Sequence, residues 1–343
     1  MQDALEHSDA EAVRDDSPQQ PKTWKSIVSK WLSIVLPLAL GFALIVYQYN
    51  QFTPQQLQEM KGYFVSANYF YIGLSLFVAL FGFLSRAYRW KFALEHMGYQ
   101  THFKNNLMAV CISYFINLTI PRSGEISRAV ILKKYEDVPF SKGFGTIVAE
   151  RIVDLAIFFL FVCVSLLFQF RTLKNFILEY IPVEKLIWLA VIGFVGFIAF
   201  IVIWIYSRWT LIEKLKTKVS GLTEGLLSIY YMEKKWPYLF HSFFIWFTYF
   251  MMFYITIFAL PETSDIRLGA VMIAFVFGSL AMGFTNSGFG AFPLLIAQIF
   301  LLYGVSNTAG TAFGWLVWIS QTLLIVVLGL VSFILLPVLN RNK

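Results

Sequence analysis

Long apolar segments, repeated along the chain, are the feature that most constrains how this sequence folds. A helix needs about 20 apolar residues to cross ~30 Å of hydrocarbon, and runs of that length occur at six places. Hydrophobic residues make up 58% of the chain and charged residues only 14%, whereas soluble domains carry roughly 25% charged residues. A water-soluble fold is therefore excluded. The six runs lie at about 27–48, 70–92, 144–169, 186–206, 238–260 and 310–338.

The first residues have a different composition. Residues 1–21 hold six acidic side chains against one basic side chain, Arg14, and show no apolar periodicity. This pattern predicts a disordered, acidic cytoplasmic tail over residues 1–24 and a single membrane domain over 25–343. The two cysteines, Cys111 and Cys163, lie in apolar runs, and the histidines have no metal-ligand spacing. We expect no disulfide, no metal and no cofactor.

The distribution of Lys and Arg predicts how the chain is oriented. Cytoplasmic loops collect basic residues. The segments between spans alternate between the two membrane faces, and those on one face hold twenty basic residues whereas those on the other hold five. This asymmetry predicts a multi-pass protein of the cytoplasmic (inner) membrane with both termini in the cytoplasm. The twenty basic residues lie in segments 22–30, 86–104, 121–143, 207–238 and 341–343, and the five in 48–69, 171–185 and 261–267.

Two further apolar stretches are interrupted by Pro and Gly. The segments before and after residues 105–120 fall on the same membrane face, so this stretch must enter and return; the break lies at Ile120–Gly124. A second break, Thr285–Gly290, interrupts a stretch that starts on the opposite face. We therefore predict an all-α polytopic integral membrane protein with about six full spans and two re-entrant broken-helix hairpins of opposite orientation, at about 104–134 and 268–304. The alternative is two ordinary loops between short, tilted helices.

Paired hairpins of this kind are typical of inverted-topology transporters, whose binding site lies where the broken helices meet. Irregular backbone at membrane depth is tolerated when it is buried in protein or lines a wet cavity. The second tip is uncharged, and from Leu268 to Asn340 there is no Asp, Glu, Lys, Arg or His. Its candidate site residues are Asn286, Ser287, Gly288 and Gly290.

The first tip is charged. Five of its residues form a candidate binding site for an anionic headgroup, because arginines and the unpaired N–H groups of a helix start attract phosphate. A juxtamembrane basic loop is the alternative reading. The five residues are Arg122, Ser123, Gly124, Glu125 and Arg128.

A second charged set, Glu150, Arg151 and Asp154, lies inside an apolar run. At ~1.5 Å per residue, a helix entering near Lys142 carries Asp154 roughly 18 Å inward. Ionisable groups at such depth usually face the bundle interior and mark a pathway or relay. We predict a buried charge network here; alternatively, Arg151 neutralises the two acids in a structural role.

Residues 208–235 show apolar positions at helical spacing beside several lysines, which predicts an amphipathic helix at the membrane surface. This helix could recruit anionic headgroups or could serve as a simple connector.

The motifs carry a family resemblance. The stretch Pro-Arg-Ser-Gly-Glu-Ile-Ser-Arg at 121–128, then Glu-Arg-Ile-Val-Asp at 150–154, then Ser-Gly-Phe-Gly at 287–290 resembles the lysylphosphatidylglycerol synthase transmembrane, or flippase-like, family. The resemblance covers nearly the whole chain after about residue 25. It implies a polytopic membrane protein that moves a lipid between leaflets.

Two departures limit what the resemblance implies. The sequence ends at Lys343, directly after the last span, so we expect no soluble aminoacyl-transferase half and no lipid-lysylating activity. The family's Gly-rich motif typically ends in a Glu, whereas Pro293 stands at that place here. This change puts proton coupling through the second hairpin and recognition of a cationic headgroup in doubt.

We therefore predict a lipid flippase or translocase, not an enzyme, whose substrate is an anionic phospholipid or polyprenyl-phosphate-linked lipid. A membrane-embedded enzyme acting on a lipid phosphate and a non-transporting accessory protein remain open. Expected partners are the membrane lipid and either a second copy of the chain or a synthase or glycosyltransferase; no nucleic acid is expected.

Overall fold

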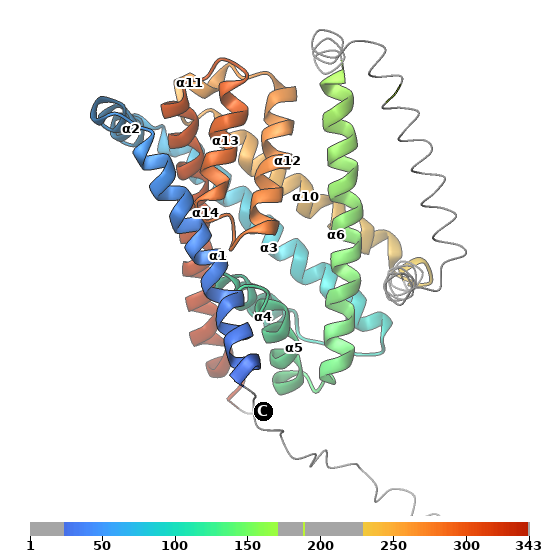
Figure 1. Cartoon of the computed structure of the whole chain (residues 1–343). Coiled ribbons are helices and arrows are strands. Elements are labelled where there is room, and N and C mark those ends of the chain that lie inside the picture. Colours follow the sequence, from blue (N-terminus) through green and yellow to red (C-terminus); the bar gives the residue numbers. More distant parts are fainter. Residues whose placement is uncertain (1–23, 171–187, 189–228, 342–343) are drawn as a thin grey trace, which may run out of the picture.

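The computed structural model describes residues 24–170, 188 and 229–341, with side chains from residue 35 onward. Every regular element within these ranges is an α-helix (Figure 1). The helices are α1 Trp24–Asn50, α2 Pro54–Ser66, α3 Tyr69–His96, α4 Phe103–Thr119, α5 Gly124–Tyr135, α6 Phe140–Phe168, α10 Lys235–Ile257, α11 Pro261–Ser264, α12 Leu268–Phe284, α13 Ala291–Leu301 and α14 Asn307–Leu339.

The long helices match the predicted spans. By length and composition α3, α6, α10 and α14 can each cross a membrane, and α1 and α2 pass the same test as a pair bent by 112°. Five of the six predicted apolar runs therefore coincide with helices, whereas the run at 186–206 lies outside the described residues. The prediction of an all-α polytopic membrane protein is confirmed.

Both predicted hairpins are pairs of shorter helices separated by a break. α4 and α5 flank residues 120–123, and α12 and α13 flank residues 285–290. Each pair folds back on itself: Gly124, at the start of α5, packs against Ser113 of α4, and Gly278 of α12 packs against Phe292 of α13.

Both hairpins pack against α14. It has 33 residues, which corresponds to ~50 Å of helix. Its first half packs on the second hairpin, where Gly310 lies against Ala297, and its last half packs on the first hairpin, where Gly329 lies against Phe115. Small residues at such contacts allow close helix approach, which is how helices associate in lipid.

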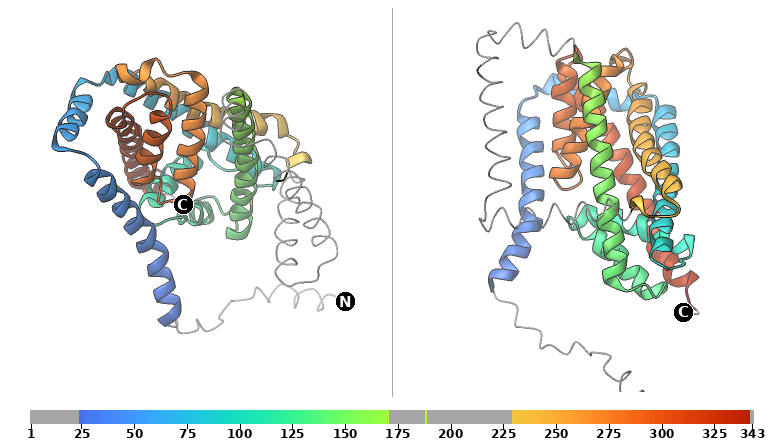
Figure 2. Two further views of the ribbon diagram at one scale, coloured as in Figure 1. Left: turned by 45° about the horizontal axis from the view of Figure 1, so that its top comes forward. Right: turned by 90° about the vertical axis from the view of Figure 1, so that its right-hand side faces the viewer.

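The two hairpins point in opposite directions along α14 (Figures 1 and 2). α4 begins beside the end of α14, where Asn340 Nδ2 donates a hydrogen bond of 2.9 Å to Asn105 Oδ1. α13 instead ends next to the start of α14. The start of α1 lies at the same end of the molecule as the end of α14 (Figure 1). That this end faces the cytoplasm stays a prediction.

The largest apolar core lies among α10, α12, α13 and α14. Four of its aromatic rings, one from each helix, are in contact, and the rings of Phe253 and Phe313 meet edge to face with centroids 5.4 Å apart. The other two rings belong to Phe275 and Phe292. This uncharged block holds the second hairpin against α14.

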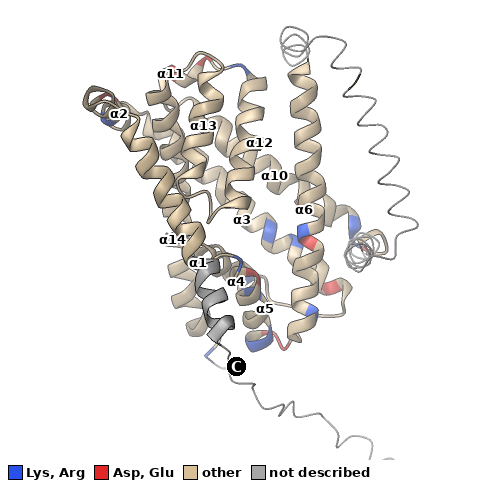
Figure 3. Ribbon diagram, in the orientation of Figure 1, with Lys and Arg blue, Asp and Glu red and all other residues tan. Residues whose placement is uncertain are grey.

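Many of the charged residues of the described chain lie instead on α3, α5 and the first part of α6 (Figure 3). The distribution of basic residues predicts that Arg86 and Arg89 lie in a basic cytoplasmic segment at 86–104. That assignment is wrong, because α3 continues to His96 and both arginines are buried, with 3% and 0% of their surface exposed. A helix that begins with apolar residues can carry charges in its last turns when neighbouring helices supply partners.

Two other predictions lie outside the described residues: the acidic tail at 1–24, apart from Trp24 at the start of α1, and most of the interfacial helix at 208–235. The described end of that second range forms a turn at Tyr231–Lys234 before α10 begins.

Candidate functional site

The tips of the two hairpins touch. Asn286 Nδ2 of the second tip donates a hydrogen bond of 2.9 Å to the main-chain oxygen of Leu118, and Ser287 Oγ lies 3.5 Å from the main-chain oxygen of Asn117. Trp318 Nε1 of α14 donates to the main-chain oxygen of Ser287 at 2.8 Å. The last carbonyls of a helix lack partners within it, and here the other hairpin supplies the donors. We call these five residues the tip junction.

At the first tip, Arg122 has a left-handed backbone with φ 62° and an exposed side chain. Its neighbours are engaged inside the hairpin: Ser123 Oγ donates to the main-chain oxygen of Ile120 at 2.6 Å, and the Gly124 N–H donates to Asn117 Oδ1 at 2.7 Å. The Ser123 side chain does not cap α5. Arg122 is therefore the predicted tip residue that is left facing outward.

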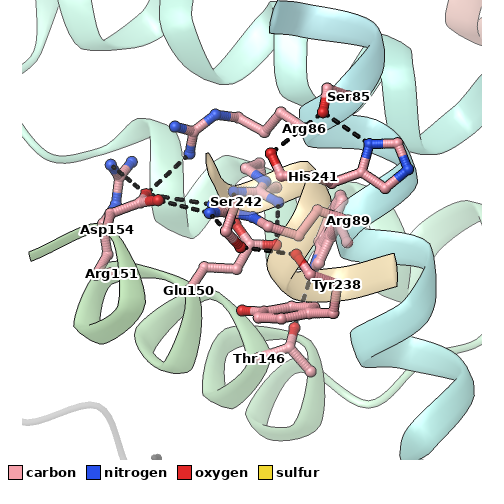
Figure 4. Close-up of polar contacts among 12 residues, drawn as sticks. Ser85, Arg86, Arg89, Thr146, Glu150, Arg151, Asp154, Tyr238, His241 and Ser242 are labelled. Atoms are coloured by element: carbon pink, nitrogen blue, oxygen red, sulfur yellow. Dashed lines mark hydrogen bonds and ion pairs between the residues drawn. The ribbon is translucent and has the colours of Figure 1, made fainter. Parts of the chain in front are cut away.

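Seven charged side chains from α3, α5 and α6 form one connected set, which we call the charge network; Figure 4 shows its centre. Four are arginines and three are acids, so the network carries one excess positive charge. Its members are Arg86, Arg89, Glu125, Arg128, Glu150, Arg151 and Asp154.

Glu150 is held by arginines of two other helices. Arg128 of α5 donates from both terminal nitrogens, at 3.1 and 3.3 Å, and Arg89 Nη2 of α3 lies at 3.4 Å. The Arg128 guanidinium also lies over the ring of Trp90, 3.9 Å from its centroid. Glu150 is fully buried. A buried carboxylate is tolerated when its partners are this well arranged.

Asp154 is held in the same way. Arg89 donates to it at 2.5 and 3.2 Å, and Arg86 at 3.4 Å (Figure 4). Arg89 also donates to Ser242 Oγ of α10 at 3.3 Å. The guanidinium of Arg89 therefore joins α3, α6 and α10 in one layer.

Arg151 lies at the edge of the network. It pairs with Glu125 at 2.7 Å and lies 3.9 Å from Asp154, and 47% of its side chain is exposed. The alternative in which Arg151 neutralises both acids is therefore wrong for Glu150. Arg128 and Arg89 fill that role, because they lie on neighbouring helices and reach across to α6.

The network also reaches α4. Arg86 Nη2 donates to the Tyr249 hydroxyl at 3.2 Å, and this hydroxyl lies 2.7 Å from that of Tyr114 on α4. Since Arg128 and Glu125 belong to α5, both halves of the first hairpin are attached to the network.

The predicted site residues thus separate into two places. Arg128, which was grouped with Arg122 as a phosphate ligand, is buried in the network with 2% of its surface exposed. Sequence reasoning missed Arg86 and Arg89 as network members. Arg86 and Arg89 are three residues apart, so both lie on one face of a helix. Glu150 and Asp154 are four residues apart and share a face in the same way. These two matching spacings are the signal that could have identified the arginines.

Comparison with known proteins identifies the chain's relatives. The sequence matches the family described as the lysylphosphatidylglycerol synthase TM region over residues 32–329. This chain belongs to that family. It is also 29% identical over 206 residues to the UPF0104 membrane protein MJ1595 of Methanocaldococcus jannaschii, a match that covers 59% of this chain and 57% of that protein. The match thus spans a little over half of the relative's length. No solved structure matches the chain.

The second tip of this lysylphosphatidylglycerol synthase TM-family protein is tightly packed. Gly288 and Gly290 have φ of 78° and 71°, and a Cβ on Gly290 would lie 2.3 Å from the main-chain oxygen of Gly41 in α1. Pro293, at the place where the resemblance implies an acid, packs against Gly314 of α14. Within the described ranges, no group of three or more His, Cys, Asp or Glu is suited to hold a metal.

Proposed function

We propose that this protein is a lipid translocase that moves an anionic lipid across the cytoplasmic membrane, with both termini on the cytoplasmic side. The lipid is a phospholipid or a polyprenyl-phosphate-linked species. Membership of a family described by a lipid synthase's membrane region supports a lipid as the substrate.

The observation that carries the proposal is the excess positive charge of the charge network, whose buried members are three arginines and two acids. Three acids do not balance four arginines, and an uncompensated charge is costly in hydrocarbon. An anionic headgroup would remove that excess. The exposed Arg122 at the tip of the same hairpin would make the first contact with a lipid phosphate.

The connections of the first hairpin support a role in movement. Arg128 and Glu125 join α5 to α6, and Tyr114 joins α4 to Tyr249 and Arg86. A headgroup that competes for one of these arginines would loosen the hairpin and its contact with the second tip. This gives the network two arrangements, one with and one without lipid, as alternating access requires.

The test is headgroup-resolved lipid movement in proteoliposomes that contain the purified full-length chain. We expect selective movement of phosphatidylglycerol over phosphatidylcholine, and a loss of about 10- to 100-fold in Arg122→Gln, since a hydrogen bond to a charged group contributes about 1.5–3 kcal/mol. Lys61→Gln is the matched control, because Lys61 is exposed on α2, away from both hairpin tips. Full activity in folded Arg122→Gln would contradict the proposal.

The same vesicles distinguish a translocase from an enzyme. We propose that the lipid leaves chemically unchanged, so mass spectrometry of the recovered lipid should show no new species. Turnover of phosphatidylglycerol without its movement would instead establish an enzyme, and neither turnover nor movement would favour an accessory protein.

A further inference from the structure

His241 forms a polar contact beside the charge network. This contact has no role in the proposed function so far. His241 Nδ1 lies 2.8 Å from Ser85 Oγ, which also lies 3.3 Å from the His241 main-chain oxygen. The contact joins α10 to α3 next to the network, since Ser85 precedes Arg86 and Ser242 accepts a hydrogen bond from Arg89 (Figure 4).

The surroundings of the imidazole are aromatic and cationic. The ring of Tyr88 stacks on it with centroids 5.7 Å apart, and Phe92 lies at 5.8 Å. The titratable and charged groups that face it come from α3, namely Tyr88 and Arg89, while α4 approaches through Phe103, which packs on Tyr88. In the described part of the chain no acid forms an ion pair with His241. The ring is half-buried.

The acids of the charge network are already engaged. Glu125, Glu150 and Asp154 each lie in an ion pair with an arginine. The second hairpin and α14 hold no acid, base or histidine. Away from helix ends, His241 is the one histidine within the described spanning helices, and histidine is the side chain that changes charge between about pH 5 and pH 8.

We propose that His241 is the proton-binding site that couples anionic-lipid binding to a proton, an inference that rests on the proposed function. A proton on His241 raises the excess charge beside Arg89 from one to two, and the phosphate of a lipid compensates the added charge. The imidazole takes up one proton from water and later releases it, and the Ser85 hydroxyl accepts a hydrogen bond from Nδ1 when the ring is protonated.

Reciprocity then fixes the direction of both effects. Protonation strengthens binding of the anionic lipid, and the lipid strengthens binding of the proton. Couplings between sites are typically 5- to 150-fold, and we expect about tenfold here. A tenfold coupling corresponds to a rise of about one pH unit in the midpoint at which His241 titrates.

The first experiment measures phosphatidylglycerol movement in phosphatidylcholine vesicles from about pH 5 to about pH 8, with equal pH on both sides. We expect the wild-type rate to fall about tenfold from the lowest to the highest pH. At every pH, the rate of His241→Gln should stay at the value that the wild type shows at about pH 8. Gln retains a neutral hydrogen-bonding group toward Ser85. His96→Gln, at the end of α3, is the matched control and should keep the wild-type pH dependence.

The second experiment follows the imidazole of His241 by NMR in nanodiscs of phosphatidylcholine, with and without phosphatidylglycerol. The signal is assigned by its absence from His241→Gln. A rise of the midpoint by about one pH unit with phosphatidylglycerol supports the proposal, and an unchanged midpoint overturns it.

The two proposals fail in different ways. If the wild type moves phosphatidylglycerol at a rate that does not depend on pH, or if His241→Gln keeps the pH dependence, coupling through His241 is overturned and the translocase proposal stands. If the wild type moves no anionic lipid at any pH, the proposed function fails and the coupling falls with it.

Discussion

Asn286, at the tip of the second hairpin, donates a hydrogen bond of 2.9 Å to the main-chain oxygen of Leu118, 168 residues earlier at the tip of the first. This bond joins two half-helix pairs that approach each other from opposite ends of α14. If lipid passes between the tips, the bond must break in every transport cycle.

A cross-link at this position tests that requirement. In a chain whose native cysteines are replaced, we expect oxidised Leu118→Cys/Asn286→Cys to lose phosphatidylglycerol movement and to recover it on reduction. Gln48→Cys/Thr311→Cys is the control pair, because Gln48 of α1 contacts Thr311 of α14 at 3.0 Å, outside the tip junction. Unchanged transport in fully cross-linked tips would mean that they do not separate.

Buried and exposed arginines of the network should differ in their effect on stability. Arg89 is fully buried and paired with two acids, so Arg89→Gln should lower the free energy of unfolding by about 3–5 kcal/mol, since it leaves buried charge uncompensated. Arg151 is half-exposed, and Arg151→Gln should cost less than about 1 kcal/mol. Denaturant unfolding in detergent micelles measures both losses, and equal losses would contradict this view of the network.

Gly124 should tolerate no side chain. A Cβ at this position would lie 2.1 Å from the main-chain oxygen of Ser113, so Gly124→Ala must push α5 away from α4. We expect a loss of about 1–3 kcal/mol in the free energy of unfolding. Gly145→Ala on α6 is the matched control, because nothing lies within 4 Å of its added Cβ; it should be neutral or slightly stabilising. A Gly124→Ala protein as stable as the wild type would contradict this close contact between α4 and α5.

Substitution of Arg122 should lower lipid movement without lowering stability. Its φ of 62° is a conformation that costs a non-glycine residue about 1–3 kcal/mol. Arg122→Gly should therefore keep or raise the thermal unfolding temperature while it removes the guanidinium, and we expect phosphatidylglycerol movement to fall as in Arg122→Gln. A less stable Arg122→Gly protein would show that the Arg122 side chain holds the tip together.

Much of the fold could be read from the sequence because it depends on local properties. Apolar runs of spanning length predicted the long helices, and Pro121 and the glycines at 288 and 290 marked the two breaks, since these residues interrupt helices wherever they occur. The basic segments before and after residues 105–120 fall on the same predicted membrane face, and this predicted two hairpins of opposite orientation. The positions of Glu150 and Asp154 within an apolar run predicted buried charge.

The pairing of those charges could not be read in this way. Arg86 and Arg89 were counted in a basic segment although both lie in the apolar run at 70–92, because the sequence does not show which arginines meet acids on other helices. Arg122 and Arg128 lie six residues apart in one motif, yet the start of α5 separates them, so that one faces outward and the other lies over Trp90.

The sequence by itself therefore determined that the chain lies in a membrane, where five of its long helices and the two breaks lie, and which residues carry charge, since each of these follows from composition and order along the chain. Tertiary structure alone decided that Arg89 and Arg128 meet Glu150 and that Asn286 meets Leu118. An ion pair or hydrogen bond depends on distances of a few ångströms between helices far apart in sequence, and only the packing of those helices sets such distances.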